Sequence, residues 1–192
     1  MPELRLPALQ VLDLSNNQWA GGLEPLSGCT ALQSLRLSSN ELTGTLAPLQ
    51  GLTGLTELNL AANRLTGSLE PLRPLTRLRL LLIPNNRAMR RGLTGGLEPL
   101  RGCTALTCLF LTNPNPSPSP NPSPNPSPNP NPNPNPNQEL ACLFLPGNTL
   151  TGTLEPLQSC ARLRRLDLRE TLLAGTAEEK AHLQTQCHLF RI

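Results

Sequence analysis

The stretch from Leu32 to Gly54 reads LQSLRLSSNELTGTLAPLQGLTG, and the next 23 residues, from Leu55, read LTELNLAANRLTGSLEPLRPLTR. The two segments align without a gap. Each has leucine at its first, fourth and sixth positions, asparagine at the ninth, an apolar residue at the eleventh and glycine at the thirteenth. Self-similarity at a fixed period of this length is typical of a protein built from stacked structural units.

The same unit recurs along most of the chain. Leucine makes up 44 of the 192 residues, whereas aromatic residues make up only 2%. An irregular core needs varied side-chain shapes to pack closely, so a core of one residue type indicates one environment that is repeated. No unit can bury its leucines alone, and stacking must build the core. The leading leucines are Leu9, Leu32, Leu55, Leu78, Leu106, Leu140 and Leu163, spaced 23, 23, 23, 28, 34 and 23 residues apart.

The fourth to eighth positions of each unit alternate apolar and variable residues, which predicts a half-buried strand. One strand per unit, always in the same direction, predicts a parallel sheet with neighbours about 4.8 Å apart. The ninth-position asparagine should satisfy backbone groups inside the bend after the strand. The asparagines are Asn17, Asn40, Asn63, Asn86 and Asn148; they are followed by turn glycines at 21, 44, 67, 95 and 152 and by prolines at 25, 48, 71, 99 and 156.

This LxxLxLxxNxLxG pattern resembles the leucine-rich-repeat family, from Leu4 to about Gly175 apart from one insert. The GTL-EPL half is similar to plant and algal forms, which usually run LxGxIPxxL with one residue more. The resemblance implies an α/β-type repeat solenoid, a horseshoe with a concave parallel β-sheet and a mostly irregular or 3-10 convex side. It also implies a non-enzymatic module that binds a protein or peptide partner on the concave face, without a cofactor.

The chain divides into four predicted segments. Two blocks of repeats, 1–112 and 140–175, flank a low-complexity insert at 113–139, in which every even position from 114 to 136 is proline. A tract without apolar side chains has nothing to bury, so we expect a solvated loop. The last segment, 176–192, leaves the repeat pattern, and Ala177–Leu189 is expected to form a short helix that covers the last repeat. Five extra residues, Ala88–Gly92, should bulge at a turn.

The variable residues between the fixed leucines should project from the open side of the sheet in rows. They are mostly polar on the first three strands and apolar on the next three, including two of the three phenylalanines of the chain. Contiguous exposed apolar surface marks an interaction site, and aromatic residues are favoured anchors. The predicted partner-binding residues are Arg36, Glu57, Asn59, Leu80, Leu82, Cys108, Phe110, Cys142, Phe144, Arg165 and Asp167, and Val11, Asp13, Ser15, Ser34, Ser38, Ala61, Pro84 and Arg169 complete the surface.

Several alternatives to this site remain open. A slipped register, or a proline-rich loop folded back as a lid, would cover the two phenylalanines. The chain is alternatively a fragment of a leucine-rich-repeat receptor ectodomain (receptor-like kinase or receptor-like protein), or a drifting repeat fragment with no selected partner. Self-association through the apolar rows is a further possibility. Six arginines between Arg73 and Arg91 are interpreted as solvated turns rather than as an acidic docking site.

The six cysteines indicate packing rather than chemistry. Cys29, Cys103 and Cys160 take the place of a repeat leucine, where a small apolar thiol fits. Cys108 and Cys142 should lie on adjacent strands, where a disulfide is conceivable but strained. Cys187 next to His188 has no further ligand that would support a zinc site.

Other function classes find little support in the sequence. The only histidines are His182 and His188, and nucleophile-elbow, Walker and kinase motifs are absent, so an enzyme is not expected. A net charge of +3 and the lack of tyrosine argue against nucleic acid. No apolar run approaches the 18–20 residues, roughly, of a membrane span. The first ten residues do not resemble a signal peptide, and no N-glycosylation sequon occurs, which favours an intracellular or unglycosylated protein.

Overall fold

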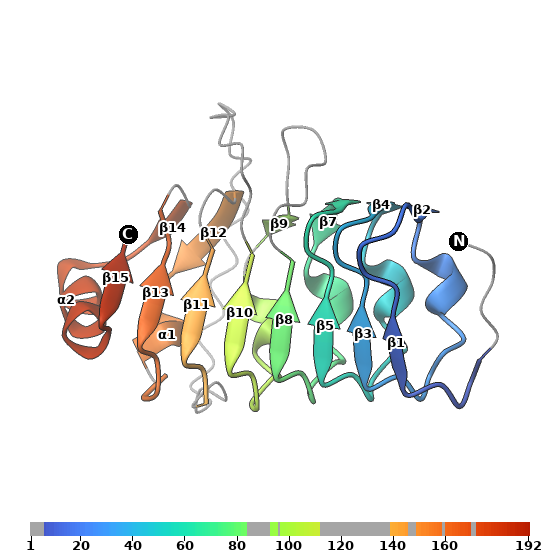
Figure 1. Ribbon diagram of the computed structural model, residues 1–192. Helices are drawn as coiled ribbons and strands as arrows, with labels where there is room; N and C mark the ends of the chain where they lie inside the picture. Colours follow the sequence, from blue (N-terminus) through green and yellow to red (C-terminus); the bar gives the residue numbers. More distant parts are fainter. Residues whose placement is uncertain are drawn as a thin grey trace.

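The computed structural model describes residues 6–83, 93–95, 97–111, 139–145, 149–158, 160–169 and 172–192. Within these residues, eight short parallel strands lie side by side in chain order and form one sheet across the molecule (Figure 1). The repeat solenoid expected from the sequence is therefore present. The strands are β1 (Val11–Asp13), β3 (Ser34–Arg36), β5 (Glu57–Asn59), β8 (Leu80–Leu82), β10 (Cys108–Phe110), β11 (Cys142–Phe144), β13 (Arg165–Asp167) and β15 (Leu189–Arg191).

The core lies directly behind this sheet and consists almost entirely of leucine. The middle residue of each inner strand points into it, as Leu35, Leu58 and Leu81 do, and each of these is fully buried. Burial of one such side chain stabilises a fold by about 1.5–3 kcal/mol. The three cysteines that replace repeat leucines are fully buried as well, which confirms the packing role predicted for Cys29, Cys103 and Cys160.

The asparagines that follow β1, β3 and β5 hold the bends there, as predicted. Asn63 is 2% exposed, and its amide donates hydrogen bonds to the carbonyls of Leu37 (2.9 Å), Leu60 (3.1 Å) and Ala61 (3.1 Å). Its side-chain oxygen accepts the backbone N–H of Leu42 at 3.0 Å. Asn40 makes an equivalent set one repeat earlier. The bonds to Leu37 and Leu42 link successive repeats because these two residues lie in the preceding unit, whereas Leu60 and Ala61 belong to the unit of Asn63.

Beyond the bend, the chain forms a second set of strands that sequence analysis missed. They pair in parallel in two short sheets, β2-β4-β6 and β7-β9-β12-β14, along the upper edge of the molecule in Figure 1. Turn glycines Gly21, Gly44 and Gly67 occur within this layer at φ of 93°, 86° and 95°, values that require glycine. The strands are β2 (Ala20–Gly21), β4 (Glu41–Gly44), β6 (Arg64–Leu65), β7 (Gly67–Ser68), β9 (Leu93–Gly95), β12 (Thr149–Thr153) and β14 (Leu172–Ala174).

Where the structure describes it, the return of a unit on the convex side is a single helical turn, as expected. Proline stands at the start of the four 3-10 turns, where its missing N–H costs no hydrogen bond. Each turn buries a leucine at its end, for example Leu26 and Leu49. The turns are η1 (Glu24–Leu26), η2 (Ala47–Leu49), η3 (Glu70–Leu72) and η4 (Glu98–Leu100), and the corresponding segment of the seventh unit is the short helix α1 (Glu155–Gln158).

The C-terminal segment ends the stack with a helix and one more strand. A helix was predicted over Ala177–Leu189, and helix α2 (Ala177–Gln186) begins there but ends three residues earlier, because Leu189 starts a strand. It starts at a capping box: Glu179 N–H donates to the hydroxyl of Thr176 (3.2 Å), and its carboxylate accepts the Thr176 N–H (2.8 Å). Strand β15 was not predicted, so the sheet has eight strands in the described residues rather than seven. Cys187, Phe190 and Ile192 stand where Leu163, Leu166 and Leu168 stand in the preceding unit, and this spacing was the missed signal.

Some predicted features fall outside the described residues. These are Pro84, Asn86, Asn148, the extra residues Ala88–Gly92 and nearly all of the insert at 113–139. The two strands that flank the insert are described, and they pair directly: Cys108 is in register with Cys142, and Phe110 with Phe144. The repeat stack therefore continues across the insert.

Candidate functional site

The eight-stranded sheet turns its outer residues away from the leucine core, and we call this surface the open face. The first and third residues of each strand lie on it, and parallel pairing aligns them in two rows. Register along these rows places every predicted partner-binding residue on this face. One row runs Val11, Ser34, Glu57, Leu80, Cys108, Cys142 and Arg165, and the other runs Asp13, Arg36, Asn59, Leu82, Phe110, Phe144 and Asp167.

An apolar patch occupies the centre of the open face. It comprises Leu80, Leu82, Cys108, Phe110, Cys142 and Phe144, on strands β8, β10 and β11, and all six are partly exposed. The rings of Phe110 and Phe144 stack with centroids 4.6 Å apart. The register is therefore not slipped in these irregular units, and both rings stand on the side opposite Leu109 and Leu143, which are buried.

A polar network precedes the patch on the first three strands. Arg36 lies between two acids: it donates to the carboxylate of Glu57 at 2.9 Å and approaches that of Asp13 at 4.0 Å. The Ser34 hydroxyl donates to the same Glu57 carboxylate at 3.2 Å. The side-chain oxygen of Asn59 accepts the backbone N–H of Ala61, two residues later in the same unit. All these groups are at least partly exposed, and such pairs add little stability.

A basic cluster follows the patch on the last two strands. Asp167 is the one predicted site residue whose side chain does not reach solvent, with 3% of its surface exposed. Arg169 contacts its carboxylate through Nη2 (2.8 Å) and Nε (3.0 Å), and Arg191 lies 3.9 Å away. The expectation that Asp167 projects to solvent is wrong because these arginines cover it. Arg165, on the same strand, is exposed.

The electrostatics of the buried carboxylate follow from its neighbours. The hydrogen bonds from Arg169 lower the pKa of Asp167, and they outweigh the opposing effect of burial. Burial raises the pKa of Cys103 and Cys160 to about 11, so these thiols are protonated and unreactive at neutral pH. All six cysteines are thiols, and Cys108 and Cys142 are not bridged.

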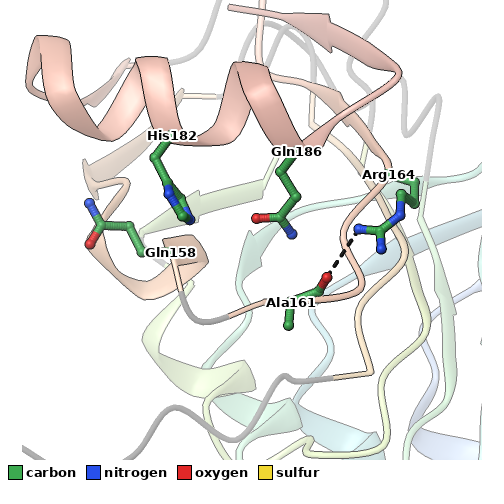
Figure 2. A pocket seen from close by; sticks show the side chains of 5 residues that line it. All are labelled: Gln158, Ala161, Arg164, His182 and Gln186. Atoms are coloured by element: carbon green, nitrogen blue, oxygen red, sulfur yellow. Dashed lines mark hydrogen bonds between the residues drawn. The ribbon is translucent and has the colours of Figure 1, made fainter.

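A shallow hollow lies away from the open face, between α2 and the end of α1. Figure 2 shows Gln158, Ala161, Arg164, His182 and Gln186 around it. Two of its polar side chains already bind backbone: Arg164 donates to the Ala161 carbonyl at 3.0 Å, and Gln186 to the Cys160 carbonyl at 2.5 Å. The Gln186 bond fastens the terminal helix to the last repeat, whereas the Arg164 bond lies within that repeat.

The described part of the chain has neither a metal-binding cluster of side chains nor a membrane-spanning helix. No three side chains among its histidines, cysteines, aspartates and glutamates are grouped so that they could hold a metal ion. None of its helices combines the length and the apolar character needed to cross a membrane.

Comparison with known proteins agrees with the fold. A family model described as leucine-rich repeats in two copies matches residues 30–74, and the same unit continues on both sides of this region. The chain has the fold of a leucine-rich-repeat solenoid. No curated protein matches it significantly.

Solved structures resemble this chain over most of its length. One is the ectodomain of the Arabidopsis thaliana receptor kinase GASSHO1/SCHENGEN3 in complex with CASPARIAN STRIP INTEGRITY FACTOR 2, at 28% identity and a TM-score of 0.73, covering 96% of this chain and 21% of the receptor chain. Another is the Arabidopsis receptor kinase HAESA in complex with the peptide hormone IDA and the co-receptor SERK1, at 28% identity and a TM-score of 0.66, covering 97% and 30%.

A third neighbour shows that the fold serves other purposes too. A plant ice-binding protein matches this chain at 24% identity and a TM-score of 0.56, covering 85% of this chain and 49% of that one, a likeness of fold alone. This protein spans 21–30% of the length of the two receptor structures.

Proposed function

We propose that this chain is a non-enzymatic module that binds a protein or peptide partner on its open face, centred on Phe110 and Phe144. The observation that carries the proposal is the stacked pair of rings on the solvent side of the sheet. Large apolar side chains lower the free energy of a protein when they are covered. The buried core has room for leucine at every inner position, yet these rings point outward.

The surroundings of the patch suit a binding surface. Its residues stand on hydrogen-bonded strands, so little conformational entropy is lost when they are covered. Charged groups flank it on both sides, with Asp13, Arg36 and Glu57 at one end and Arg165, Arg169 and Arg191 at the other. An apolar centre with a polar rim is the usual anatomy of a protein interface. Two similar receptor ectodomains are solved with bound peptide or protein ligands, which supports the same class of partner here.

The receptor alternative has a specific observation in its favour. Several structural neighbours are parts of plant receptor ectodomains, and this chain covers 28% or less of two of them. On this proposal, the chain supplies one stretch of a longer ligand-binding solenoid. Flanking genomic sequence tests it: a signal peptide upstream and a membrane span downstream would support the receptor, and stop codons in every frame would contradict it.

The double variant Phe110→Ser and Phe144→Ser tests the binding proposal on the full chain. A partner is first captured with the wild-type protein from its source cell, purified, and its affinity for wild type is measured. The double variant should keep the circular dichroism spectrum and lose binding of this purified partner. Val11→Ser is a matched control, because Val11 is 60% exposed on the same face but lies on β1, away from the patch.

Two outcomes would contradict the proposal. If the double variant unfolds, the rings support the core and the site is misassigned. If it folds and binds as tightly as wild type, the partner uses another surface. Light scattering distinguishes a second copy of this chain from a different partner: a concentration-dependent dimer that disappears in the double variant identifies self-association.

A further inference from the structure

Both ends of the eight-stranded sheet are open edges. In the described residues, β1 pairs only with β3 and β15 pairs only with β13, so each end strand has one side without a partner strand. The two ends lie at opposite sides of the molecule (Figure 1). The large apolar side chains that are exposed in the described residues, Leu6, Val11 and Ile192, all lie at these ends. An apolar sheet edge is a template for pairing with another chain.

The leucine core is incompletely covered at both ends as well. Leu12 on β1 is only partly buried, although its counterpart one unit later, Leu35, is fully buried. At the other end, Phe190 on β15 is partly buried and Ile192 is exposed. Repeat units bury their apolar faces by stacking on a neighbour. Each end therefore presents the apolar face that one more unit would cover.

The outer edge of β1 carries unpaired backbone groups. The carbonyl of Gln10 accepts a hydrogen bond from β3 at 3.0 Å, and the N–H of Leu14 donates to β3 at 2.9 Å. Because backbone groups alternate in direction along a strand, those of Val11 and Asp13 point away from β3. These are the groups that a further strand would meet at this end.

The outer edge of β15 carries the complementary set. The N–H of Leu189 and the carbonyl of Arg191 bond to β13 at 3.3 Å and 2.7 Å, which turns the backbone groups of Phe190 outward. In the same way, β13 faces β15 with the carbonyl of Arg164 and the N–H of Leu168. A β1 strand placed beside β15 would therefore meet the same donors and acceptors that β15 meets on β13.

Charges in one row of the open face alternate at both ends. Arg36 approaches Asp13 at 4.0 Å at one end, and Arg191 approaches Asp167 at 3.9 Å at the other. The row thus ends in an acid on β1 and in a base on β15, and both end side chains are half exposed. A second copy that places its β1 after β15 would continue the alternation, with Arg191 between two aspartates. Complementary charges of this kind select a partner and fix its register.

We propose that copies of this chain assemble end to end, with β1 of one copy pairing in parallel with β15 of another. The junction continues the register that joins β13 to β15, so Leu189 lies beside Val11 of the second copy and Arg191 lies beside its Asp13. The apolar residues between them join the two cores, and one contact covers both exposed ends. Such a contact is heterologous, so every assembly keeps a free end on each side and can grow.

Sedimentation velocity of the full chain over a range of concentrations tests the proposal. The average mass of the wild type should rise beyond that of a dimer as the concentration increases. Val11→Pro blocks one end: it removes an outward N–H at the first residue of an edge strand, where proline is tolerated. Leu189→Glu blocks the other end, because it puts an acid near Asp13 of the next copy, while Arg165 is beside it in its own chain. Each variant alone should lose assembly.

An equimolar mixture of the two blocked variants is the decisive measurement. Each variant keeps the end that the other has lost, so the mixture should form a 1:1 dimer and nothing longer. Val11→Thr is the matched control, because it keeps both the N–H and a β-branched side chain, and it should assemble as wild type does. Phe110→Ser with Phe144→Ser leaves both ends intact and should also assemble, so this proposal and partner binding fail independently.

Three results would overturn the proposal: a wild type that stays monomeric at every concentration, a mixture of folded variants that stays monomeric, or a Leu189→Glu variant that assembles as wild type does. The last result would indicate that β1 pairs with β1 of the second copy instead. Circular dichroism of each variant distinguishes loss of the junction from loss of the fold. If a blocked variant is unfolded, Asp13→Asn tests the junction through its charge: assembly should weaken and depend less on salt.

Discussion

The rings of Phe110 and Phe144 stack with planes 3° from parallel, although 34 positions and the whole proline-rich tract separate the two residues in sequence. They meet because β10 and β11 pair in register, residue by residue. A stack of this kind contributes about 0.5–1.5 kcal/mol beyond the area that it buries. The stack therefore stabilises the contact between β10 and β11, the two strands on either side of the insert. Both rings remain partly exposed.

Neighbouring residues on β10 should differ in their effect on stability. Leu109 is 2% exposed in the core, whereas Phe110 stands on the open face. We expect Leu109→Ala to lower the free energy of unfolding by about 2–5 kcal/mol, and Phe110→Ala by no more than about 1.5 kcal/mol, the value of its stack. Urea denaturation followed by circular dichroism measures both. Equal losses would mean that Phe110 packs as a core residue.

The buried asparagines of the bends should contribute more to the free energy of unfolding than the exposed Asn17, their counterpart in the first unit. Asn63→Ala leaves three backbone carbonyls and the Leu42 N–H without their side-chain partner. A buried group that loses its partner costs about 1–3 kcal/mol, so we expect a total loss of roughly 2–4 kcal/mol. Asn17→Ala is the control, because Asn17 is exposed and bonds only the carbonyls of Leu14 and Ser15 within its own unit. It should lose less than about 1 kcal/mol by the same measurement.

Acid should destabilise the C-terminal end of the sheet through Asp167. Its pKa is lowered by the hydrogen bonds from Arg169, so the folded pKa lies below the unfolded value of about 3.9. The stabilisation is present above the unfolded value and is lost as the pH falls through the folded pKa. Asp167→Asn should therefore lower stability at pH 7 and flatten its decline below about pH 4.

The control for this titration is Glu41→Gln. Glu41 pairs with Arg64 at 3.6 Å, and both side chains are more than half exposed. An exposed pair of this kind contributes little, so the variant should keep the wild-type decline in acid. Thermal unfolding between pH 2 and 7 measures both variants. An unchanged acid profile in Asp167→Asn would show that the buried carboxylate is not coupled to folding.

The proline-rich tract should be dispensable for the stability of the stack. We propose that Asn113–Asn137 is an insert, because β10 and β11 pair across it and the tract contains no apolar side chain other than proline. Replacement by a short Gly-Ser link should change the free energy of unfolding little, since the cost of closing a loop grows slowly with its length. A loss of more than about 2 kcal/mol, the size of a substantial single-site effect, would mean that the tract packs against the solenoid.

Periodicity alone determined the main features of this protein. The spacing of Leu35, Leu37 and Asn40 within one unit predicted strand, buried face and bend, because each position has the same environment in every repeat. The same spacing predicted that Phe110 and Phe144 lie on the open face. Such predictions succeed because nearest-neighbour contacts dominate a repeat stack.

Departures from the repeat were decided by tertiary contacts. Strand β15 escaped notice because Cys187, Phe190 and Ile192 replace the three leucines, and the packing of Phe190 against the core establishes that this spacing is an eighth unit. The repeat spacing predicts that Asp167 faces solvent, yet Arg169 and Arg191 cover its carboxylate. Alternation fixes the direction in which a side chain leaves a strand. Whether that side chain then meets water depends on neighbouring charges. For Asp167 these are Arg169, two residues later in the same unit, and Arg191 from β15, and only the folded chain brings both to the carboxylate.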